Sequence, residues 1–327
     1  MINLKNKTIL ITGGTGSFGK NFTKFLLENT EAKKIIIFSR DENKQFHMQK
    51  EFSDDKRLRF FIGDVRDLLR LKRSFTGVDI VIHAAALKHV PAMEYNPFEA
   101  VKTNIIGSQN VIEAAVDQKI SKILLISTDK AAQPTNLYGS TKLCAEKLFA
   151  NGNVYAPEKS IFSAVRYGNV IGSRGSIVET LMKNKNSTKK VQITDPNMTR
   201  FWITLPQAFE LVMFALENME GGEIFVPKIP SMKISDLFKA IVPDAQQEII
   251  GRRPGEKMHE ILLSKEEARH SVEFGNYYVI LPEFHYFSND AYQKYYKIGN
   301  KLNDDFCFSS NTNKDWLTEG QLLKLIA

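Results

Sequence analysis

Short apolar runs alternate with longer amphipathic segments through the first half of the chain. Runs rich in Ile, Val, Leu and Phe predict buried strands at 8–12, 34–39, 58–62, 78–83, 122–127 and 161–166. The helix-length segments between them predict helices at 18–28, 42–52, 97–118 and 137–150. This alternation of strand and helix favours the α/β class, with a doubly wound parallel sheet and right-handed crossovers.

The regular alternation ends near Tyr167, and Gly and Pro clusters follow at 172–175, 227–230 and 253–255. The change predicts a first domain over residues 1–168 and a smaller C-terminal lobe over residues 169–327. A strand at 223–226 that returned to the main sheet would make this lobe an interleaved extension of the first domain.

The composition is that of a globular protein: 43% of the 327 residues are hydrophobic and 25% are charged. The formal net charge is +7, but the Lys and Arg residues are scattered, so we expect no nucleic acid partner. A small polyanionic ligand and a generally Lys-rich surface both remain possible explanations of the charge. The chain contains neither a membrane-length apolar stretch nor a signal-peptide core, which predicts a cytoplasmic protein without a membrane span.

We expect no metal site. Cys144 and Cys307 match no metal-ligand spacing, and the six histidines include no His-x-x-x-His pair. Packed thiols are the simpler interpretation of the two cysteines.

A glycine-rich loop follows the first predicted strand and opens the first helix, with Gly13, Gly16 and Gly19 at its three fixed positions. Glycine permits the tight turn and close approach that a pyrophosphate needs, and the helix N-terminus offers N–H groups to the phosphates. A loop at this place predicts a Rossmann dinucleotide site. Thr15, Ser17 and Phe18 lie in the same loop and are further expected cofactor contacts.

The second predicted strand ends at Ser39 and Arg40, where an NAD site usually carries an acidic residue. Arg40, with Ser39 and Lys44, can bind a ribose 2′-phosphate, so the sequence favours NADP. Asp41 leaves a second possibility open, because it could pair with Arg40 as a surface ion pair.

Residues at the ends of the next two strands are expected to contact the adenine half of the cofactor. Asp64 and Val65 follow the third strand, although Asp64 is as well suited to cap its own loop. Ala84 and Ala86 follow the fourth strand and supply small side chains beside the cofactor.

The candidate catalytic residues lie after the fifth strand. Thr128, Asp129 and Lys130 follow it directly, and Tyr138 and Lys142 are four residues apart on one face of a helix. Polar groups at the carboxyl ends of parallel strands point into a ligand crevice. A lysine one turn away is expected to lower the pKa of a tyrosine that takes a proton from a substrate hydroxyl.

The Tyr-x-x-x-Lys pair with its upstream Thr resembles the extended short-chain dehydrogenase/reductase family over nearly the whole chain. In nucleotide-sugar dehydratases of that family the Thr is followed by Asp and Glu, whereas here Asp129 is followed by Lys130. The Lys variant is similar to the inverting UDP-N-acetylglucosamine 4,6-dehydratases of the pseudaminic acid pathway. The motifs that carry this resemblance are 39–42, 87–91, 166–170, 172–176, 198–202 and 253–257.

The resemblance implies a reaction and a set of roles. Tyr138 with Lys142 would take the C4 hydroxyl proton while hydride passes to NADP. Lys130, held neutral, would remove the C5 proton, and Asp129 would donate a proton to the leaving C6 hydroxyl. Reprotonation of C5 from the opposite face would invert that centre, with Tyr138 and Lys130 as the two candidates for the donor.

The resemblance also implies contacts outside the catalytic group. Val170 is expected at the cofactor, and the expected contacts to a UDP-sugar are Lys88, Asn169, Arg174, Thr194 and Arg253. Asn104 either supports the active site or simply packs its helix, and a homo-oligomer is expected. Two rival functions are a nucleotide-sugar 4-epimerase or ketoreductase, which leaves Asp129 and Lys130 without a task, and a regulator that binds NADP without chemistry.

Overall fold

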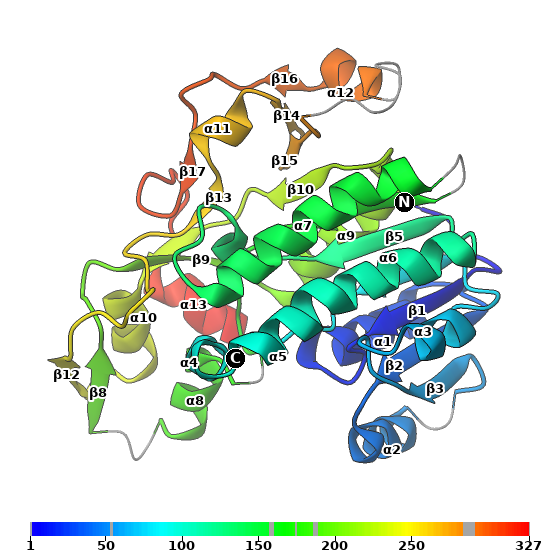
Figure 1. Ribbon diagram of the computed structural model, residues 1–327. Helices are drawn as coiled ribbons and strands as arrows, with labels where there is room; N and C mark the ends of the chain where they lie inside the picture. The colour runs from blue at the N-terminus through cyan, green and yellow to red at the C-terminus, as the bar shows by residue number, and fades with distance from the viewer. Residues whose placement is uncertain are drawn as a thin grey trace.

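The computed structural model describes residues 2–52, 55–156, 160–173, 175–185, 189–283 and 292–326. Its largest feature is a ten-stranded sheet in the order β16-β14-β15-β10-β6-β5-β4-β1-β2-β3 (Figure 1). Its strands are β1 Thr8–Thr12, β2 Lys34–Ser39, β3 Leu58–Ile62, β4 Ile80–His83, β5 Lys122–Ile126, β6 Ile161–Val165, β10 Ile224–Pro227, β14 Ser271–Phe274, β15 Tyr277–Ile280 and β16 Asn300–Lys301. Pairing is parallel from β3 across to β10, and β15, β14 and β16 add an antiparallel edge. The predicted α/β doubly wound fold is confirmed.

Helices cover both faces of this sheet, because the side chains of each central strand alternate between two cores. Ile9 of β1 belongs to one core with Phe22 of α1 and Leu211 of α9, whereas Leu10 belongs to the other with Phe149 of α7. The helices concerned are α1 Ser17–Asn29, α2 Glu42–Glu51, α3 Leu68–Ser74, α6 Gly107–Asp117, α7 Leu137–Tyr155 and α9 Leu205–Asn218.

The predicted helix at 97–118 is not a single regular helix. It divides into α5 Pro97–Val101, a π-helical turn Lys102–Ile106 and α6, with the short α4 Val90–Tyr95 before it. A π-helical turn is often found at a functional site, and this one carries Asn104. The other predicted strands and helices are present with shifts at their ends, the largest being α7, which continues to Tyr155.

The C-terminal half adds smaller elements and a third core. A three-stranded sheet contains β11 Ser231–Lys233, β9 Thr199–Ile203 and β7 Asn169–Val170, and two strand pairs join β12 Gln246–Ile249 to β8 Lys190–Ile193 and β13 Ile261–Leu263 to β17 Phe308–Ser309. The helices here are α8 Ile177–Lys183, α10 Ile234–Ile241, α11 Lys265–Ala268, α12 Gln293–Ile298 and α13 Glu319–Ile326. Of these elements, α8, β8, β11, α10 and α13 pack around the third core, whereas β13, β17, α11 and α12 pack against the first.

The strand expected near 223–226 does return to the main sheet. It is β10, which pairs with β6 in parallel. The C-terminal segment therefore supplies strands to the sheet that the N-terminal half begins, while the boundary at 168/169 stays a prediction. None of the described helices is long and apolar enough to cross a membrane.

Candidate active site

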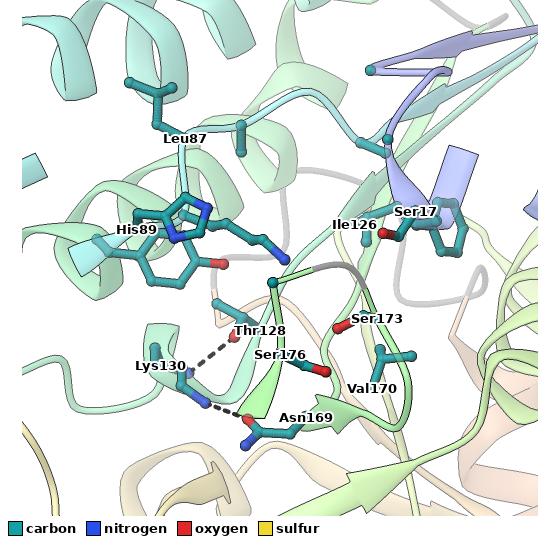
Figure 2. Close-up of a pocket in the computed structure, with 18 of the residues that line it drawn as sticks. Ser17, Leu87, His89, Ile126, Thr128, Lys130, Asn169, Val170, Ser173 and Ser176 are labelled. Carbon is teal, nitrogen blue, oxygen red and sulfur yellow. Dashed lines mark hydrogen bonds between the residues drawn. The ribbon is translucent and has the colours of Figure 1, made fainter. Parts of the chain in front are cut away.

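A cavity of about 900 Å³ lies at the carboxyl ends of the parallel strands (Figure 2). The loops after β1, β2, β4 and β5 line one side of it, and β7, β8, β9 and α10 supply residues on another side. All the predicted catalytic, cofactor and substrate residues that the structure describes line this cavity, except Asp129. Arg174 lies outside the described residues.

The glycine loop is closely packed beneath the cavity. Gly13 has a φ of +65°, and a Cβ there would lie 2.8 Å from the Cα of Ala85. A Cβ on Gly14 would lie 2.7 Å from the Cγ2 of Ile37, and one on Gly19 would lie 2.6 Å from the Cα of Gly14. A side chain would therefore not fit at Gly13, Gly14 or Gly19 without a shift of the neighbouring residues. Gly14 was not among the expected cofactor contacts.

The sequence left open an ion pair between Arg40 and Asp41 at the end of β2, but each of these residues pairs with another partner. Asp41 caps α2, accepting a hydrogen bond from the Lys44 backbone N–H at 2.9 Å, and its carboxylate lies 2.7 Å from the Lys44 ammonium. Arg40 pairs instead with Asp64, at 3.7 Å. The guanidinium of Arg40 is therefore not committed to its sequence neighbour.

Asp64 has the loop-capping role that the sequence allowed. Its carboxylate accepts hydrogen bonds from the backbone N–H of Arg66 at 3.0 Å and from the Arg66 guanidinium at 2.9 and 2.7 Å. Arg66 also donates to Glu99 at 2.7 Å. Asp64 still lines the cavity, so capping and contact with a ligand are compatible.

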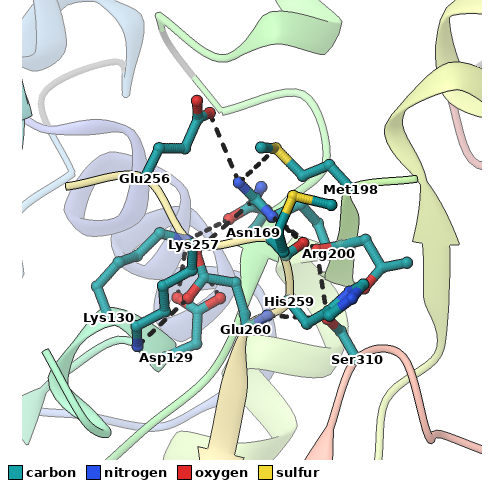
Figure 3. A network of polar contacts seen from close by, with 12 residues as sticks. Asp129, Lys130, Asn169, Met198, Arg200, Glu256, Lys257, His259, Glu260 and Ser310 are labelled. Atoms are coloured by element: carbon teal, nitrogen blue, oxygen red, sulfur yellow. Dashed lines mark hydrogen bonds and ion pairs between the residues drawn. The ribbon is translucent and has the colours of Figure 1, made fainter. Parts of the chain in front are cut away.

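Asp129–Ala131 forms a 3-10 turn shortly after β5, with Thr128 as its N-cap. The Thr128 hydroxyl donates to Oδ1 of Asp129 at 2.9 Å. The Lys130 Nζ donates to the two carboxylate oxygens of Asp129 at 2.9 and 3.1 Å, and to Oδ1 of Asn169 at 2.8 Å (Figures 2 and 3). The lysine therefore joins the end of β5 to β7.

The Asp129 carboxylate is fully buried, and Lys130 covers it on the cavity side. Burial raises the pKa of Asp129, and the negative charge of Glu260 adds to this effect. Because Asp129 does not line the cavity, a ligand would reach it through Thr128 or Lys130.

The expectation of a neutral Lys130 is wrong for the resting structure. Burial acts to lower the pKa of Lys130, but the carboxylates of Asp129 and Glu260 outweigh it, and the net effect is a raised pKa. Lys130 is therefore a half-buried ammonium held by acceptors. It becomes a base only after it loses a proton.

The expected lowering of the Tyr138 pKa is also absent. Burial raises the pKa of Tyr138 to about 12, although Lys130 and a hydrogen bond with Thr128 act in the opposite direction. Lys142 donates to the backbone oxygen of Ile126 at 2.8 Å, and burial lowers its pKa to about 8. Burial thus favours the neutral form of both side chains.

Three charged residues beneath Lys130 were missed as site residues. Oε1 of Glu260 lies 3.6 Å from the Lys130 Nζ and 3.7 Å from Nε of Arg200, and Oε2 lies 3.7 Å from the Lys257 Nζ (Figure 3). Arg200 and Lys257 fall within motifs that supported the family resemblance, but no role was assigned to them. Glu260 follows Lys130 by 130 positions, and no local pattern connects the two.

A second ion cluster fixes the segment around Glu260. Arg166, which is completely buried, donates to both oxygens of Glu146 at 3.0 and 2.7 Å and to both oxygens of Glu267 at 3.0 and 2.7 Å. It also donates to the backbone oxygen of Leu262 at 3.0 Å. The cluster ties α7 and the end of β6 to β13 and α11.

Asn104 supports the loop after β4. Its Oδ1 accepts from the Leu87 N–H at 2.8 Å, and its Nδ2 donates to the Leu87 oxygen and to the Thr141 hydroxyl, both at 3.0 Å. Of the two roles considered for Asn104, the structure supports a connection between this loop and α7.

The remaining predicted substrate residues are spread along the cavity wall. Burial lowers the pKa of Lys88, while the charge of Glu179 acts to raise it. The Thr194 hydroxyl donates to the Met198 sulfur at 3.4 Å, and the backbone N–H of Arg253 donates to Glu256 at 3.3 Å. Within the described ranges, no group of three His, Cys, Asp or Glu side chains could hold a metal.

Comparisons with known proteins agree with this architecture. The family described as polysaccharide biosynthesis protein matches residues 9–282. The chain is 50% identical to a UDP-N-acetylglucosamine 4,6-dehydratase (inverting) of Campylobacter jejuni, over 100% of this chain and 98% of the relative. It is 41% identical to a UDP-glucose 4-epimerase of Rickettsia bellii, over 98% of this chain and 96% of the relative.

Solved structures extend the likeness. Pen from Bacillus thuringiensis superposes with a TM-score of 0.89 at 36% identity, covering 99% of this chain and 98% of Pen. The dTDP-glucose 4,6-dehydratase DesIV from Streptomyces venezuelae, solved with NAD and TYD bound, has a TM-score of 0.70 at 21% identity, covering 77% and 86% of the two chains. The second likeness concerns the fold alone. The matched family and the full-length relatives show that the chain belongs to the polysaccharide biosynthesis protein family, within the extended short-chain dehydrogenase/reductase architecture.

Proposed function

We propose that this protein catalyses the NADP-dependent 4,6-dehydration of UDP-N-acetylglucosamine with inversion at C5. The observation that carries the proposal is the Asp129–Lys130 pair, hydrogen-bonded at 2.9 Å beside Thr128 and Tyr138. Hydride transfer at C4 alone needs no second acid and base, whereas elimination of water needs both. The C. jejuni relative, 50% identical, is named for this reaction.

The residues fit a nicotinamide dinucleotide. Gly13 and Gly19 have no room for a Cβ, as expected of the fixed glycines of a pyrophosphate-binding loop. The buried Ser127 hydroxyl lines the cavity without a partner among the described residues. When bound, the cofactor accepts hydride from C4 and later returns it to C6. Tyr138 first loses its own proton to solvent, and the Lys142 ammonium, one helical turn away, stabilises the resulting phenolate. The phenolate then takes the C4 hydroxyl proton and becomes neutral again.

The elimination follows from the Asp129–Lys130 pair. Transfer of one proton from the Lys130 ammonium to the Asp129 carboxylate converts the ion pair into a neutral amine and a neutral acid. The amine then removes the C5 proton, which the 4-keto group acidifies. The acid proton reaches the departing C6 hydroxyl through the Thr128 hydroxyl, which donates to Asp129 and lines the cavity. Water leaves, and Lys130 is an ammonium again. The return of hydride to C6 is balanced by a proton delivered to C5 from the opposite face, which inverts that centre, and Tyr138 and Lys130 are the two candidates for the donor.

The preference for NADP over NAD rests on Arg40. It lines the cavity beyond β2, and its ion pair with Asp64 is long at 3.7 Å. A 2′-phosphate would offer the guanidinium a stronger, charge-assisted partner. Asp41 does not compete, because its carboxylate is bound to Lys44 and to the α2 N-terminus.

We extend the proposal to the place of the reaction. The motif set and the word "inverting" in the name of the C. jejuni relative support a first step in pseudaminic acid synthesis for surface glycans. The same resemblance supports a homo-oligomeric enzyme acting in the cytoplasm.

The test is incubation of the purified protein with UDP-N-acetylglucosamine in deuterated water, followed by NMR. We expect a 4-keto-6-deoxy product of L-arabino configuration that carries deuterium at C5. The relatives named as 4-epimerases give the rival its strongest support. A C4 epimer that keeps its C6 hydroxyl, or unchanged sugar, would overturn the dehydratase proposal.

A further inference from the structure

Lys130 is shared between two carboxylates from distant parts of the chain. Asp129 is its neighbour in sequence, and Glu260 arrives from the segment before β13, with Oε1 at 3.6 Å from the Lys130 Nζ (Figure 3). The Glu260 side chain is only 4% exposed. Its Oε2 has no hydrogen-bond partner among the described residues, and its nearest cation is Lys257 at 3.7 Å. A glutamate this deeply buried requires an electrostatic reason for its charge.

The backbone holds Glu260 in place independently of its carboxylate. The Glu260 N–H donates to the Ser310 hydroxyl at 2.9 Å, and the Glu260 oxygen accepts from the Ser310 N–H at 2.8 Å. Lys257 is anchored separately, through a hydrogen bond to the Ala132 oxygen at 2.6 Å. The carboxylate charge can therefore be removed without releasing this segment.

The charged groups around the pair come from several elements. Asp129 lies on the turn after β5 and Arg200 on β9, while Lys257 and Glu256 lie in the segment before β13. Tyr138 approaches from α7 and interacts electrostatically with Lys130. Arg200 and Lys257 already balance Glu260 in part, so the effect of Glu260 on Lys130 is smaller than that of an isolated carboxylate.

We propose that Glu260 is a positioning residue for the elimination pair: its carboxylate is the second anion that keeps Lys130 an ammonium and aligns it with Asp129 in the resting enzyme. This inference rests on the proposed function for its meaning in catalysis, but the charge relation itself is a property of the chain. Glu260 acts through Lys130 and lies outside the cavity lining, so it does not contact substrate. The C-terminal segment thereby sets the protonation state of a residue on the N-terminal sheet.

The test measures the protonation of Lys130 without relying on activity. The whole protein is pulse-labelled with acetic anhydride over a range of pH, and the acetylated fraction of Lys130 is measured by mass spectrometry. Lys130 lines the cavity with its side chain 23% exposed, so the reagent can reach it. The variants are Glu260→Gln, Glu260→Asp and Lys257→Met. Glu223→Gln is the matched control, because Glu223 is equally buried but is bonded to Ser163 and Tyr295, remote from the cavity.

Removing the negative charge should let Lys130 lose its proton at lower pH. We expect the labelling midpoint to fall by about 1 pH unit in Glu260→Gln, the low end of the range for an opposite charge at this separation, because Arg200 and Lys257 already balance Glu260 in part. Glu260→Asp retains a carboxylate, so its midpoint should stay close to that of the wild type. Glu223→Gln should leave the midpoint unchanged, and Lys257→Met should move it to higher pH. Should the Gln variant not fold, Glu260→Asp decides the question, because its shorter carboxylate lies farther from the Lys130 Nζ and should lower the midpoint in the same direction by a smaller amount. An unchanged midpoint in the folded Gln variant, or a fall in Lys257→Met, would overturn the inference.

Activity separates this inference from the proposed function. If the wild type dehydrates UDP-N-acetylglucosamine, Glu260→Gln should shift the pH profile of kcat with little change in KM. If the wild type does not dehydrate the sugar but the labelling midpoint still falls, the dehydratase proposal fails and the role of Glu260 in setting the charge of Lys130 stands. If Glu260→Gln keeps both the wild-type pH profile of kcat and the wild-type labelling midpoint, the role proposed for Glu260 is refuted and the dehydratase proposal is unaffected.

Discussion

Replacing Arg166 by Met should reveal how much the buried ion cluster contributes to stability. The guanidinium donates to two carboxylates and one backbone oxygen, and neither Arg166 nor the side chain of Glu146 is exposed. Arg166→Met leaves the Glu146 carboxylate buried without its cation, a change that typically costs about 3–5 kcal/mol. With an unfolding entropy of roughly 2.1 cal/mol/K per residue, this corresponds to a fall in Tm of about 4–7 °C for the 327-residue chain.

The pH dependence gives the sharper test. Burial acts to raise the pKa of Glu267, but Arg166 outweighs it and lowers that pKa to about 2 from the ordinary 4.5. A depressed carboxyl pKa stabilises the fold above about pH 4.5, and this stability is lost as the pH falls from 4.5 towards 2. The shift is worth about 3 kcal/mol at neutral pH. Without the arginine this contribution disappears, so the wild type and the variant should converge on acidification.

The assay is urea denaturation of wild type and Arg166→Met at pH 7 and again near pH 4. Arg66→Met is the matched control, because Arg66 also binds two carboxylates, Asp64 and Glu99, but its side chain is 36% exposed. An exposed cluster contributes only about 0–1 kcal/mol. A loss at Arg166 no larger than at Arg66, or a loss that does not narrow at lower pH, would refute this reasoning.

Three further substitutions test the site. Lys130→Ala should abolish elimination as followed by NMR while binding of NADP, measured by calorimetry, is retained; normal turnover would remove Lys130 from the mechanism. Arg40→Ala should weaken NADP by about 10-fold or more, the value of a lost charge-assisted hydrogen bond, without changing the affinity for NAD, and equal losses for both would contradict the assignment. Gly14→Ala places a Cβ 2.7 Å from Ile37 and should cost about 1–3 kcal/mol in thermal or urea unfolding, an overpacking penalty that an unchanged midpoint would disprove.

Much of the fold and the cavity lining follows from local patterns in the sequence. Strand periodicity places Thr128 and Lys130 at a strand end, and helical spacing places Tyr138 and Lys142 on one face. Parallel strands bring their carboxyl ends to the same edge, so these residues meet the loop that begins at Gly13. None of these steps needs long-range information beyond the order of the strands.

The charge states could not be predicted in the same way. Whether Lys130 is neutral or charged depends on Glu260, whose place is fixed by pairing with Ser310 and by the cluster around Arg166, all distant in sequence. The pKa of Tyr138 depends on burial, which periodicity does not reveal for a residue that lines a cavity. The break of the predicted 97–118 helix into a π-helical turn is likewise a tertiary feature, set by the contacts of Asn104.

The three hydrogen bonds of Asn104 have a mechanical consequence for how the cavity can change shape. They couple the backbone of Leu87 to α7 through Thr141, so the cofactor wall moves as a unit with the helix that carries Tyr138 and Lys142. A hinge on this side can begin only beyond Leu87. Larger or smaller ligands would then be accommodated by the opposite wall, where Ile193 of β8, Trp202 of β9 and Phe238 of α10 belong to a different core. Substrate range can therefore change through that wall while the hydride-transfer geometry stays constant.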